Sequence, residues 1–213
     1  MTYQNLSITN GVGAELNFKY NGKMNNTHDT QLEMIRCMDD AVFKSNSTKE
    51  ICSKVKSVLE EWVNANTILL DSHYLEPEPN SYARRLLHRD PEGRYSIAVM
   101  VWGQGQGTPI HDHAGLWCVE CVYSGLIKVD SYSMQGLPED EVVNFKKMTS
   151  INAGCGSAGS LIPPFDYHTI SNAQPTPSVT MHVYGGDMNW CNIYQEKERG
   201  KYEKIRRELS FSS

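Results

Sequence analysis

Hydrophobic positions along the chain change their spacing at two places, and each change predicts a different kind of element. Between residues 30 and 64, apolar residues recur three or four positions apart, which is the period of amphipathic helices. The recurring positions are Leu32, Ile35, Met38 and Val42, followed by Ile51, Val55, Val58, Leu59 and Trp62. Ser47 or Thr48 is expected to cap the second helix, with Glu50 in its first turn. We therefore expect two amphipathic helices in this part of the chain.

The segment EPEPNS at residues 76–81 ends the helical pattern, because each proline disfavours helical geometry in the residue before it. Beyond it, short β-like runs are separated by Gly, Pro, Asn and Asp. These runs cover residues 81–88, 94–103, 116–134, 142–148, 158–164, 168–173 and 178–186. Short strands at regular intervals with such punctuation predict an antiparallel sandwich or barrel.

The two ends of the chain lack these patterns. Residues 1–29 are polar and have no clear period, so we expect a loose arm. The charged segment YQEKERGKYEKIRREL predicts a solvated C-terminal helix. We accordingly divide the chain into an arm with helices at 1–79, a barrel at 80–193 and a helical tail at 194–213. A chain of 213 residues, 39% of them hydrophobic, supports one substantial core, so these parts are expected to form a single domain.

Composition narrows the function classes. The net charge is −5 and the 20 basic residues are scattered, whereas a nucleic-acid-binding surface normally has a basic stripe. The first residues do not resemble a signal peptide, and no run approaches the roughly 20 apolar residues that cross a bilayer. Six cysteines without a framework spacing are typical of free thiols in a reducing compartment. We expect a cytoplasmic monomer with neither a nucleic-acid nor a membrane partner.

A C-x-x-C pair, Cys118 and Cys121, could indicate zinc binding or redox chemistry. However, the surrounding WCVECVYSG is predicted to be a strand, and residues three apart on a strand point to opposite faces. We therefore do not expect this pair to chelate a metal.

The segment from Gly105 to Gly125 contains the first candidate chemistry. His111 and His113 would lie on one face of a strand, about 7 Å apart along the backbone, while Asp112 points to the other face. Two imidazoles in this arrangement can converge on one metal ion. The remaining histidines, His28, His73 and His88, are expected to be structural or solvated.

This segment resembles the first signature motif of the cupin superfamily, G-x5-H-x-H-x4-E-x6-G. Most cupins have a metal-binding glutamate where this chain has Cys118. The segment PPFDYHTISN resembles the second motif in part, with Pro163, His168 and Asn172 in place but Phe165 at the position of a glycine. The resemblance covers roughly residues 80–190. It implies a mainly β cupin fold, that is, a small β-barrel or double-stranded β-helix, with the N-terminal helices added.

The resemblance also implies a metal bound by His111, His113 and His168, with no carboxylate from position 118. Non-haem iron sites for oxygen chemistry usually have two histidines and a carboxylate. Three neutral imidazoles would leave the full 2+ charge facing the pocket and would favour a thiolate. Three histidines with cysteine at the glutamate position resemble the thiol dioxygenases, typified by cysteine dioxygenase. Such enzymes use Fe(2+) to add both atoms of O2 to a small thiol and give a sulfinic acid.

A late strand strengthens this resemblance. Thr180, His182 and Tyr184 match a Ser-x-His-x-Tyr series that lines the iron pocket in cysteine dioxygenases, with threonine in place of serine. The resemblance implies that the three side chains form an outer hydrogen-bonding chain. It also implies a thioether cross-link between Cys118 and Tyr184, which would act as a protein-derived cofactor.

An arginine in a Tyr-x-Arg-x-Leu strand binds the substrate carboxylate in that family. The segment YARRL offers Tyr82 with Arg84, and Arg85 is the competing register. Alternation places Arg84 on the same face as Tyr82, which favours Arg84.

The substrate remains open between several thiols. Residues 86–113 and 182–188 also resemble a bacterial branch that oxidises 3-mercaptopropionate. That branch commonly has glutamine where Arg84 lies, and it uses an arginine shortly after the tyrosine, which residues 185–193 lack. L-cysteine is therefore favoured, with 3-mercaptopropionate or another small thiol such as cysteamine as the alternative. A cupin that binds a metal or ligand without catalysis is the second alternative.

Overall fold

The computed structural model describes residues 27–137 and 139–212, so the arm expected at residues 1–29 lies almost wholly outside the described residues. Two helices come first, α1 (Thr27–Phe43) and α2 (Thr48–Asn64), followed by the short 3-10 helix η1 (Ser72–Leu75). Ser47 caps α2, because its side chain accepts a hydrogen bond from the backbone N–H of Glu50. The Glu50 carboxylate in turn accepts from the backbone N–H of Asn46. Both predicted helices and the predicted cap are confirmed.

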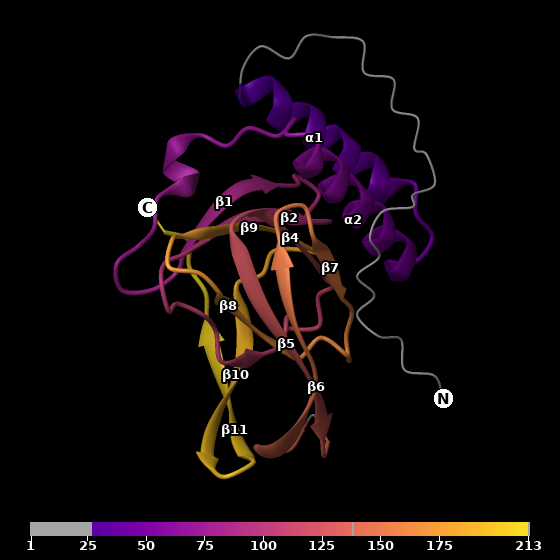
Figure 1. Ribbon diagram of the computed structural model, residues 1–213. Helices are drawn as coiled ribbons and strands as arrows, with labels where there is room; N and C mark the ends of the chain where they lie inside the picture. Colours follow the sequence, from indigo (N-terminus) through magenta and orange to yellow (C-terminus); the bar gives the residue numbers. More distant parts are fainter. Residues whose placement is uncertain (1–26, 138, 213) are drawn as a thin grey trace.

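Helix α2 packs against β4 and β7 of one sheet, and α1 packs against α2 (Figure 1). Met34 and Met38 of α1 and Val55 and Leu59 of α2 are fully buried in one hydrophobic cluster. Leu32, by contrast, is 43% exposed, so the buried stripe of α1 is rotated away from the first predicted position. The helices therefore complete the core from outside and leave the interior of the barrel to the strands.

All strand pairs are antiparallel. One sheet has the order β1-β2-β9-β4-β7, and the order β10-β11-β6-β5-β8-β3 closes into a barrel. The mainly β fold with N-terminal helices is confirmed. The strands, in chain order, are β1 (Ala83–Arg89), β2 (Ser96–Trp102), β3 (Ile110–His111), β4 (Cys118–Ser124), β5 (Leu126–Gln135), β6 (Val142–Gly154), β7 (Ala158–Leu161), β8 (His168–Asn172), β9 (Ser178–Tyr184), β10 (Trp190–Glu198) and β11 (Lys201–Glu208).

The predicted C-terminal helix is wrong. The segment forms the hairpin β10–β11, which turns at Gly200 with a positive φ of 80° (Figure 1). Its charged residues pair across the hairpin, as Lys197 does with Glu203 at 2.9 Å, and β10 and β11 also pair with β3 and β6. Pairing with the barrel outweighs the local preference of charged residues for helix. The boundary at residue 193 is therefore also wrong, because the barrel continues to residue 208.

After β11 the chain returns to the first sheet. The backbone N–H of Leu209 donates to the carbonyl of Asn189, and that of Ser212 donates to the carbonyl of Arg84 at 2.7 Å. Ser212 thus lies beside β1, whereas Leu209 lies beside Asn189. Neither helix of the described ranges has the length and apolar character that spanning a lipid bilayer requires.

Candidate active site

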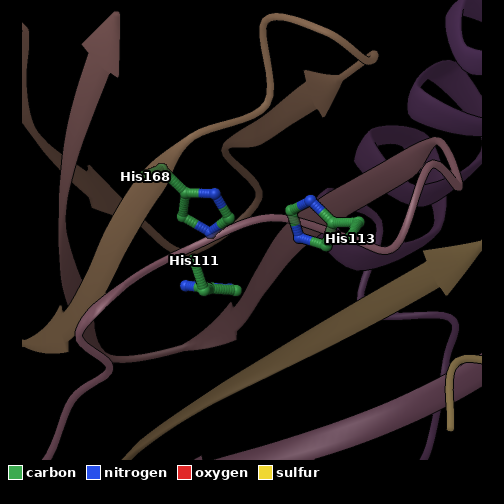
Figure 2. A group of neighbouring side chains, drawn as sticks. All are labelled: His111, His113 and His168. Carbon is green, nitrogen blue, oxygen red and sulfur yellow. The ribbon is translucent and has the colours of Figure 1, made fainter. Parts of the chain in front are cut away.

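Three histidines from two segments of the chain meet inside the barrel (Figure 2). His111 belongs to β3 and His168 begins β8, and the two residues are directly paired in the ladder between these strands. His113 follows β3 in a turn where Ala114 and Gly115 both have positive φ and the N–H of Leu116 donates to the His113 carbonyl. One ring nitrogen of each histidine lies within 4.8 Å of those of the other two. The geometry is that of a preformed metal site.

The hydrogen bonds of the three rings select the nitrogen that faces the site. His111 Nδ1 lies 3.2 Å from the carbonyl of Pro109, and His168 Nδ1 lies 3.0 Å from the carbonyl of Asp166. A carbonyl can only accept, so both Nδ1 atoms carry hydrogen, and the Nε2 atom of each ring in its neutral form presents a lone pair. His113 Nδ1 lies 3.2 Å from the Asp166 carboxylate, which accepts from it in the same way. Such partners orient metal-binding imidazoles.

The electrostatics keep two of the rings neutral. Removal from water, with His168 and His113 nearby, holds the pKa of His111 well below its usual range. Burial also lowers the pKa of His113, although the Asp166 carboxylate opposes it. Neutral imidazoles can donate lone pairs, and three of them suit iron(II) as well as zinc, nickel or copper. The donor set therefore fits the iron expected from the sequence.

Cys118 and Tyr184 lie beside this site on neighbouring strands. They are directly opposite each other in the β4–β9 ladder, and both are buried in one cluster. Burial raises the pKa of the Cys118 thiol well above its usual value. Cys121 lies in a different cluster, under the helices, so the two cysteines point to opposite faces as predicted.

The expected chain of Thr180, His182 and Tyr184 is only partly present. Thr180 Oγ1 lies 2.7 Å from His182 Nε2, and Trp102 Nε1 donates to Thr180 Oγ1 at 2.8 Å. The Tyr184 hydroxyl, however, points to the sulfur of Met100 at 4.0 Å instead of to His182. In this structure the His182 and Tyr184 rings are stacked with their centroids 5.9 Å apart, and no hydrogen bond joins them.

Arg84 and Arg85 point to opposite sides of β1. Arg84 is 4% exposed, donates from Nη2 to the carbonyl of Met188 at 2.9 Å, and leaves Nη1 buried without a hydrogen-bond partner. Its guanidinium lies over the Phe211 ring at 4.2 Å. Arg85 instead donates to the carbonyl of Glu76 at 2.7 Å and pairs with the Glu78 carboxylate at 3.4 Å.

A cavity of about 340 Å³ connects these groups. Its lining includes Tyr82, Arg84, His111, His182 and Tyr184, whereas Arg85 does not line it. Tyr82 stacks against Trp102 with ring centroids 4.7 Å apart. A small molecule in this cavity could therefore meet the His111 side of the metal site and the free Nη1 of Arg84 at once.

Glu120 is a site residue that the sequence reasoning missed. Its Oε1 lies 3.1 Å from His168 Nε2 and 3.4 Å from His182 Nδ1, and the residue lines the same cavity. Burial opposes its charge, but His168 and His182 together hold the pKa of the carboxyl well below its usual range. The site therefore contains a carboxylate, although position 118 does not supply it. Glu120 follows Cys118 by two residues, so strand alternation already places both on one face.

Two aspartates also support the site. Asp166 accepts from the backbone N–H of His113 at 3.0 Å as well as from its ring. Asp112 points away from the metal site, as predicted, and accepts hydrogen bonds from Asn192 and Tyr194 of β10. It thereby fixes the backbone between His111 and His113, which lie on either side of it. The role of Asp112 follows from strand alternation, but no local pattern identifies Asp166.

The chain matches the family model described as cysteine dioxygenase type I over residues 24–197. Among curated proteins, cysteine dioxygenase type 1 of Rattus norvegicus is 22% identical over 125 residues, which cover 58% of this chain and 60% of the relative. Cysteine dioxygenase type 1 of Danio rerio is 23% identical over 125 residues, covering 54% of this chain and 57% of the relative. The matched part thus spans less than two thirds of these relatives.

Two solved structures illustrate the structural similarity. A protein with a double-stranded β-helix domain from Klebsiella pneumoniae subsp. pneumoniae MGH 78578 has a TM-score of 0.36 at 19% identity, covering 57% of this chain and 91% of that one. Oxalate oxidase in complex with the substrate analogue glycolate has a TM-score of 0.39 at 18% identity, covering 51% and 53%.

Proposed function

The chain belongs to the cysteine dioxygenase type I family. We propose that it is an iron(II)-dependent thiol dioxygenase whose preferred thiol substrate is L-cysteine. The reaction adds both atoms of O2 to the sulfur of the thiol and gives the sulfinic acid, so no external reductant is needed. The observation that carries the proposal is the common cavity, in which the metal-facing histidine His111 and the unpaired Nη1 of Arg84 line one space of about 340 Å³.

In this proposal the Nε2 atoms of His111, His113 and His168 hold iron(II). The ion would supply a binding position for O2 and would lower the pKa of a bound thiol, so that the substrate binds as thiolate. The protein contributes the orientation of the rings, because Pro109 and Asp166 accept from their Nδ1–H groups. It also keeps the His113 and His168 rings away from bulk water, since both are buried.

Arg84 would hold the substrate carboxylate. A buried guanidinium nitrogen without a partner costs free energy, and a carboxylate would satisfy it with a charge-assisted hydrogen bond. The Arg84 guanidinium lies over the Phe211 ring and donates a hydrogen bond to the Met188 carbonyl. These two contacts fix its direction before a substrate binds. Tyr82, which lines the same cavity, would contact the substrate from the side of Trp102.

Cys118 and Tyr184 would form the thioether cross-link. The cysteine S–H and one ring C–H of the tyrosine would be lost, an S–C bond would form, and the two protons and two electrons would pass to O2 to give H2O2. The cross-strand pairing of the two residues supports this reaction, because directly opposite residues have Cβ atoms about 5 Å apart. The bond would hold the Tyr184 ring at the wall of the cavity.

The test is O2 consumption by iron-loaded protein with L-cysteine, 3-mercaptopropionate and cysteamine measured side by side. We expect uptake with cysteine, one sulfinic acid formed per O2 and the highest kcat/KM for cysteine. A higher kcat/KM for 3-mercaptopropionate would select that substrate instead, because both acids can use Arg84. Bound iron with no O2 uptake on any thiol would indicate a binding cupin and overturn the enzymatic proposal. A cytoplasmic location is part of the proposal, as none of the six cysteines forms a disulfide.

A further inference from the structure

Arg84 is a buried cation that pairs with no carboxylate in the described parts of the chain, residues 27–137 and 139–212. Its Nη2 donates to the carbonyl of Met188, and its Nη1 is buried without a partner. Two aromatic rings lie where a carboxylate would be expected. The Cζ atom of Arg84 is 4.2 Å from the ring centroid of Phe211 and 5.8 Å from that of Tyr184. Both distances are within the range in which a ring attracts a cation, so the two rings stabilise the charge.

An aromatic ring can stabilise a guanidinium without using its hydrogen-bond donors. The cation is attracted to the face of the ring, whereas the N–H bonds of a planar guanidinium point outward in its own plane. A protein carboxylate in the same place would accept from these N–H groups and would compete with the carboxylate of a substrate. The aromatic contacts of Arg84 therefore keep the cation in a buried position and leave a donor available for an anionic ligand.

Phe211 is held in this position by backbone contacts on both sides of it. Before it, the N–H of Leu209 donates to the carbonyl of Asn189 at 2.8 Å. After it, the N–H of Ser212 donates to the carbonyl of Arg84 at 2.7 Å, and the N–H of Arg84 donates to the Ser212 hydroxyl at 3.1 Å. The ring is thus fixed relative to the same residue whose side chain it covers.

The segment that carries Phe211 also builds part of the site. Leu209 lines the cavity, and both Leu209 and Phe211 pack against the buried cluster that contains Cys118 and Tyr184. Phe211 is not among the residues that line the cavity, so it can influence a bound molecule only through its neighbours. The family match covers residues 24–197, so this support of Arg84 comes from outside the matched part of the chain.

We propose that Phe211 is a positioning residue for substrate selection, which holds the Arg84 guanidinium in the direction that a thiol with a carboxylate requires. This inference rests on the proposed function, because it takes such a thiol acid as the substrate. Phe211 touches no reacting atom and acts through Arg84. Its effect is therefore confined to thiols with a carboxylate, such as L-cysteine and 3-mercaptopropionate. Cysteamine has no carboxylate for Arg84 to bind and is insensitive to Phe211.

Steady-state O2 uptake by the iron-loaded protein tests the effect on selection. Phe211→Ala should raise the KM for L-cysteine and for 3-mercaptopropionate about 5- to 30-fold and leave kcat nearly unchanged. The binding of cysteamine, measured as a substrate or as a competing thiol, should not change. Phe211→Tyr keeps the ring and should restore the KM. Phe43→Ala is the matched control, because Phe43 ends α1 with 76% of its surface exposed.

Three kinetic results would overturn the proposal. The first is an unchanged KM for both thiol acids in Phe211→Ala. The second is an equal loss of cysteamine binding, which would indicate general damage to the cavity. The third is a Phe211→Tyr variant that behaves like Phe211→Ala, because the ring would then have no role.

Chemical labelling tests the contact without any activity measurement. Phenylglyoxal adds to accessible guanidinium groups, and peptide mass mapping shows which arginines have reacted. Arg84 is buried, whereas the side chain of Arg89 on the same strand is 47% exposed and serves as the internal reference. Relative to Arg89, Arg84 should react slowly in the unmodified protein and in Phe211→Tyr, and several times faster in Phe211→Ala. Unchanged labelling of Arg84 in Phe211→Ala would show that the ring does not hold the guanidinium and would overturn the proposal.

The two measurements separate this proposal from the proposed function. If the unmodified protein oxidises thiols but Phe211→Ala changes neither the KM nor the labelling, only the positioning role fails. If the unmodified protein oxidises no thiol, the proposed function fails and the role in substrate selection fails with it, whereas faster labelling would still establish that Phe211 holds Arg84. Thermal melting checks that the variants fold. Should Phe211→Ala not fold, Phe211→Leu keeps an apolar side chain without a ring, and the same results decide.

Discussion

Cys118 lies directly opposite Tyr184 in the β4–β9 ladder, and the two side chains are buried in the same cluster. If the pair forms a thioether during turnover, the protein loses two hydrogen atoms. We expect intact-mass measurement after incubation with iron, thiol and O2 to show a species about 2 Da lighter. Cys118→Ser should show no such species, whereas Cys121→Ser, the control on the opposite face of β4, should retain it. A lighter species in Cys118→Ser would contradict the assignment.

Arg84 and Arg85 offer a matched pair for testing the carboxylate site. Arg84→Gln removes a charge-assisted hydrogen bond worth about 1.5–3 kcal/mol, so the KM for cysteine should rise about 10- to 100-fold. Because the bond is made before and during the reaction, kcat should change much less. Arg85→Gln should leave both constants nearly unchanged, since Arg85 binds Glu76 and Glu78 outside the cavity. Steady-state O2 uptake measures both, and equal effects of the two variants would refute the choice of Arg84.

Iron content tests the three histidines directly. His111→Ala or His168→Ala removes one donor atom and opens the site. We therefore expect the ratio of bound iron to protein to fall from about one ion per chain to a small fraction of that. Elemental analysis of protein purified without added chelator gives this ratio. The exposed His73 on η1 supplies the control, and His73→Ala should retain iron. Full iron retention in His168→Ala would rule out the proposed ligand set.

The hydroxyl of Thr180 joins two buried ring nitrogens, those of Trp102 and His182. Thr180→Val keeps the shape but leaves both nitrogens without a partner, which should cost about 1–3 kcal/mol of unfolding free energy and lower kcat. Thr180→Ser restores the hydroxyl and should recover most of kcat. Urea unfolding measures the free energy of unfolding of each variant, and O2 uptake by the same preparations measures kcat. If Thr180→Ser is as inactive as Thr180→Val, the methyl group and not the hydroxyl is what matters.

Asp90 and Arg94 fasten the turn between β1 and β2 through two short contacts, 2.8 Å to Nε and 2.6 Å to Nη2. The hydrogen bonds from Arg94 lower the pKa of Asp90 to about 2. A carboxyl with a depressed pKa stabilises the folded protein above its unfolded value of about 4, and that stabilisation is lost as the pH falls toward 2.

Asp90→Asn should therefore reduce the free energy of unfolding by about 2 kcal/mol at pH 7. The difference from the unmodified protein should narrow below pH 4. Denaturant unfolding at several pH values measures it. A difference that stays constant down to pH 2 would show that the charge of Asp90 contributes nothing.

Much of the fold could be predicted because periodicity records which face of an element is buried. The runs from residue 81 to 186 became strands because their apolar residues fill the two sheets, and Met34, Met38, Val55 and Leu59 mark the helix faces. The C-terminal hairpin could not be predicted in this way. Its charges fit a helix equally well, and only the edges of β3 and β6, distant in sequence, decide in favour of strands.

The site was predictable to a similar degree. The spacing of His111 and His113 already indicated that they converge, and the alternation of β1 separated Arg84 from Arg85. Glu120 was predictable from the same alternation, because it lies two residues after Cys118 on the same face of the strand. The cupin motif, however, assigns the carboxylate to position 118 and gives no role to position 120. Asp166 was not, because its contact with His113 depends on the path of the loop between β7 and β8.

The bonds between Arg84 and Ser212 join residues 128 positions apart. The Arg84 guanidinium lies against Phe211, and Ser212 pairs with the backbone of Arg84 on the same edge. Arg84 thus receives its support from a segment distant in sequence, whereas the rings of the three histidines are oriented by Pro109 and Asp166. A change at Phe211 or Ser212 would therefore alter the part of the cavity that would select the substrate and leave the part that would carry out the chemistry in place.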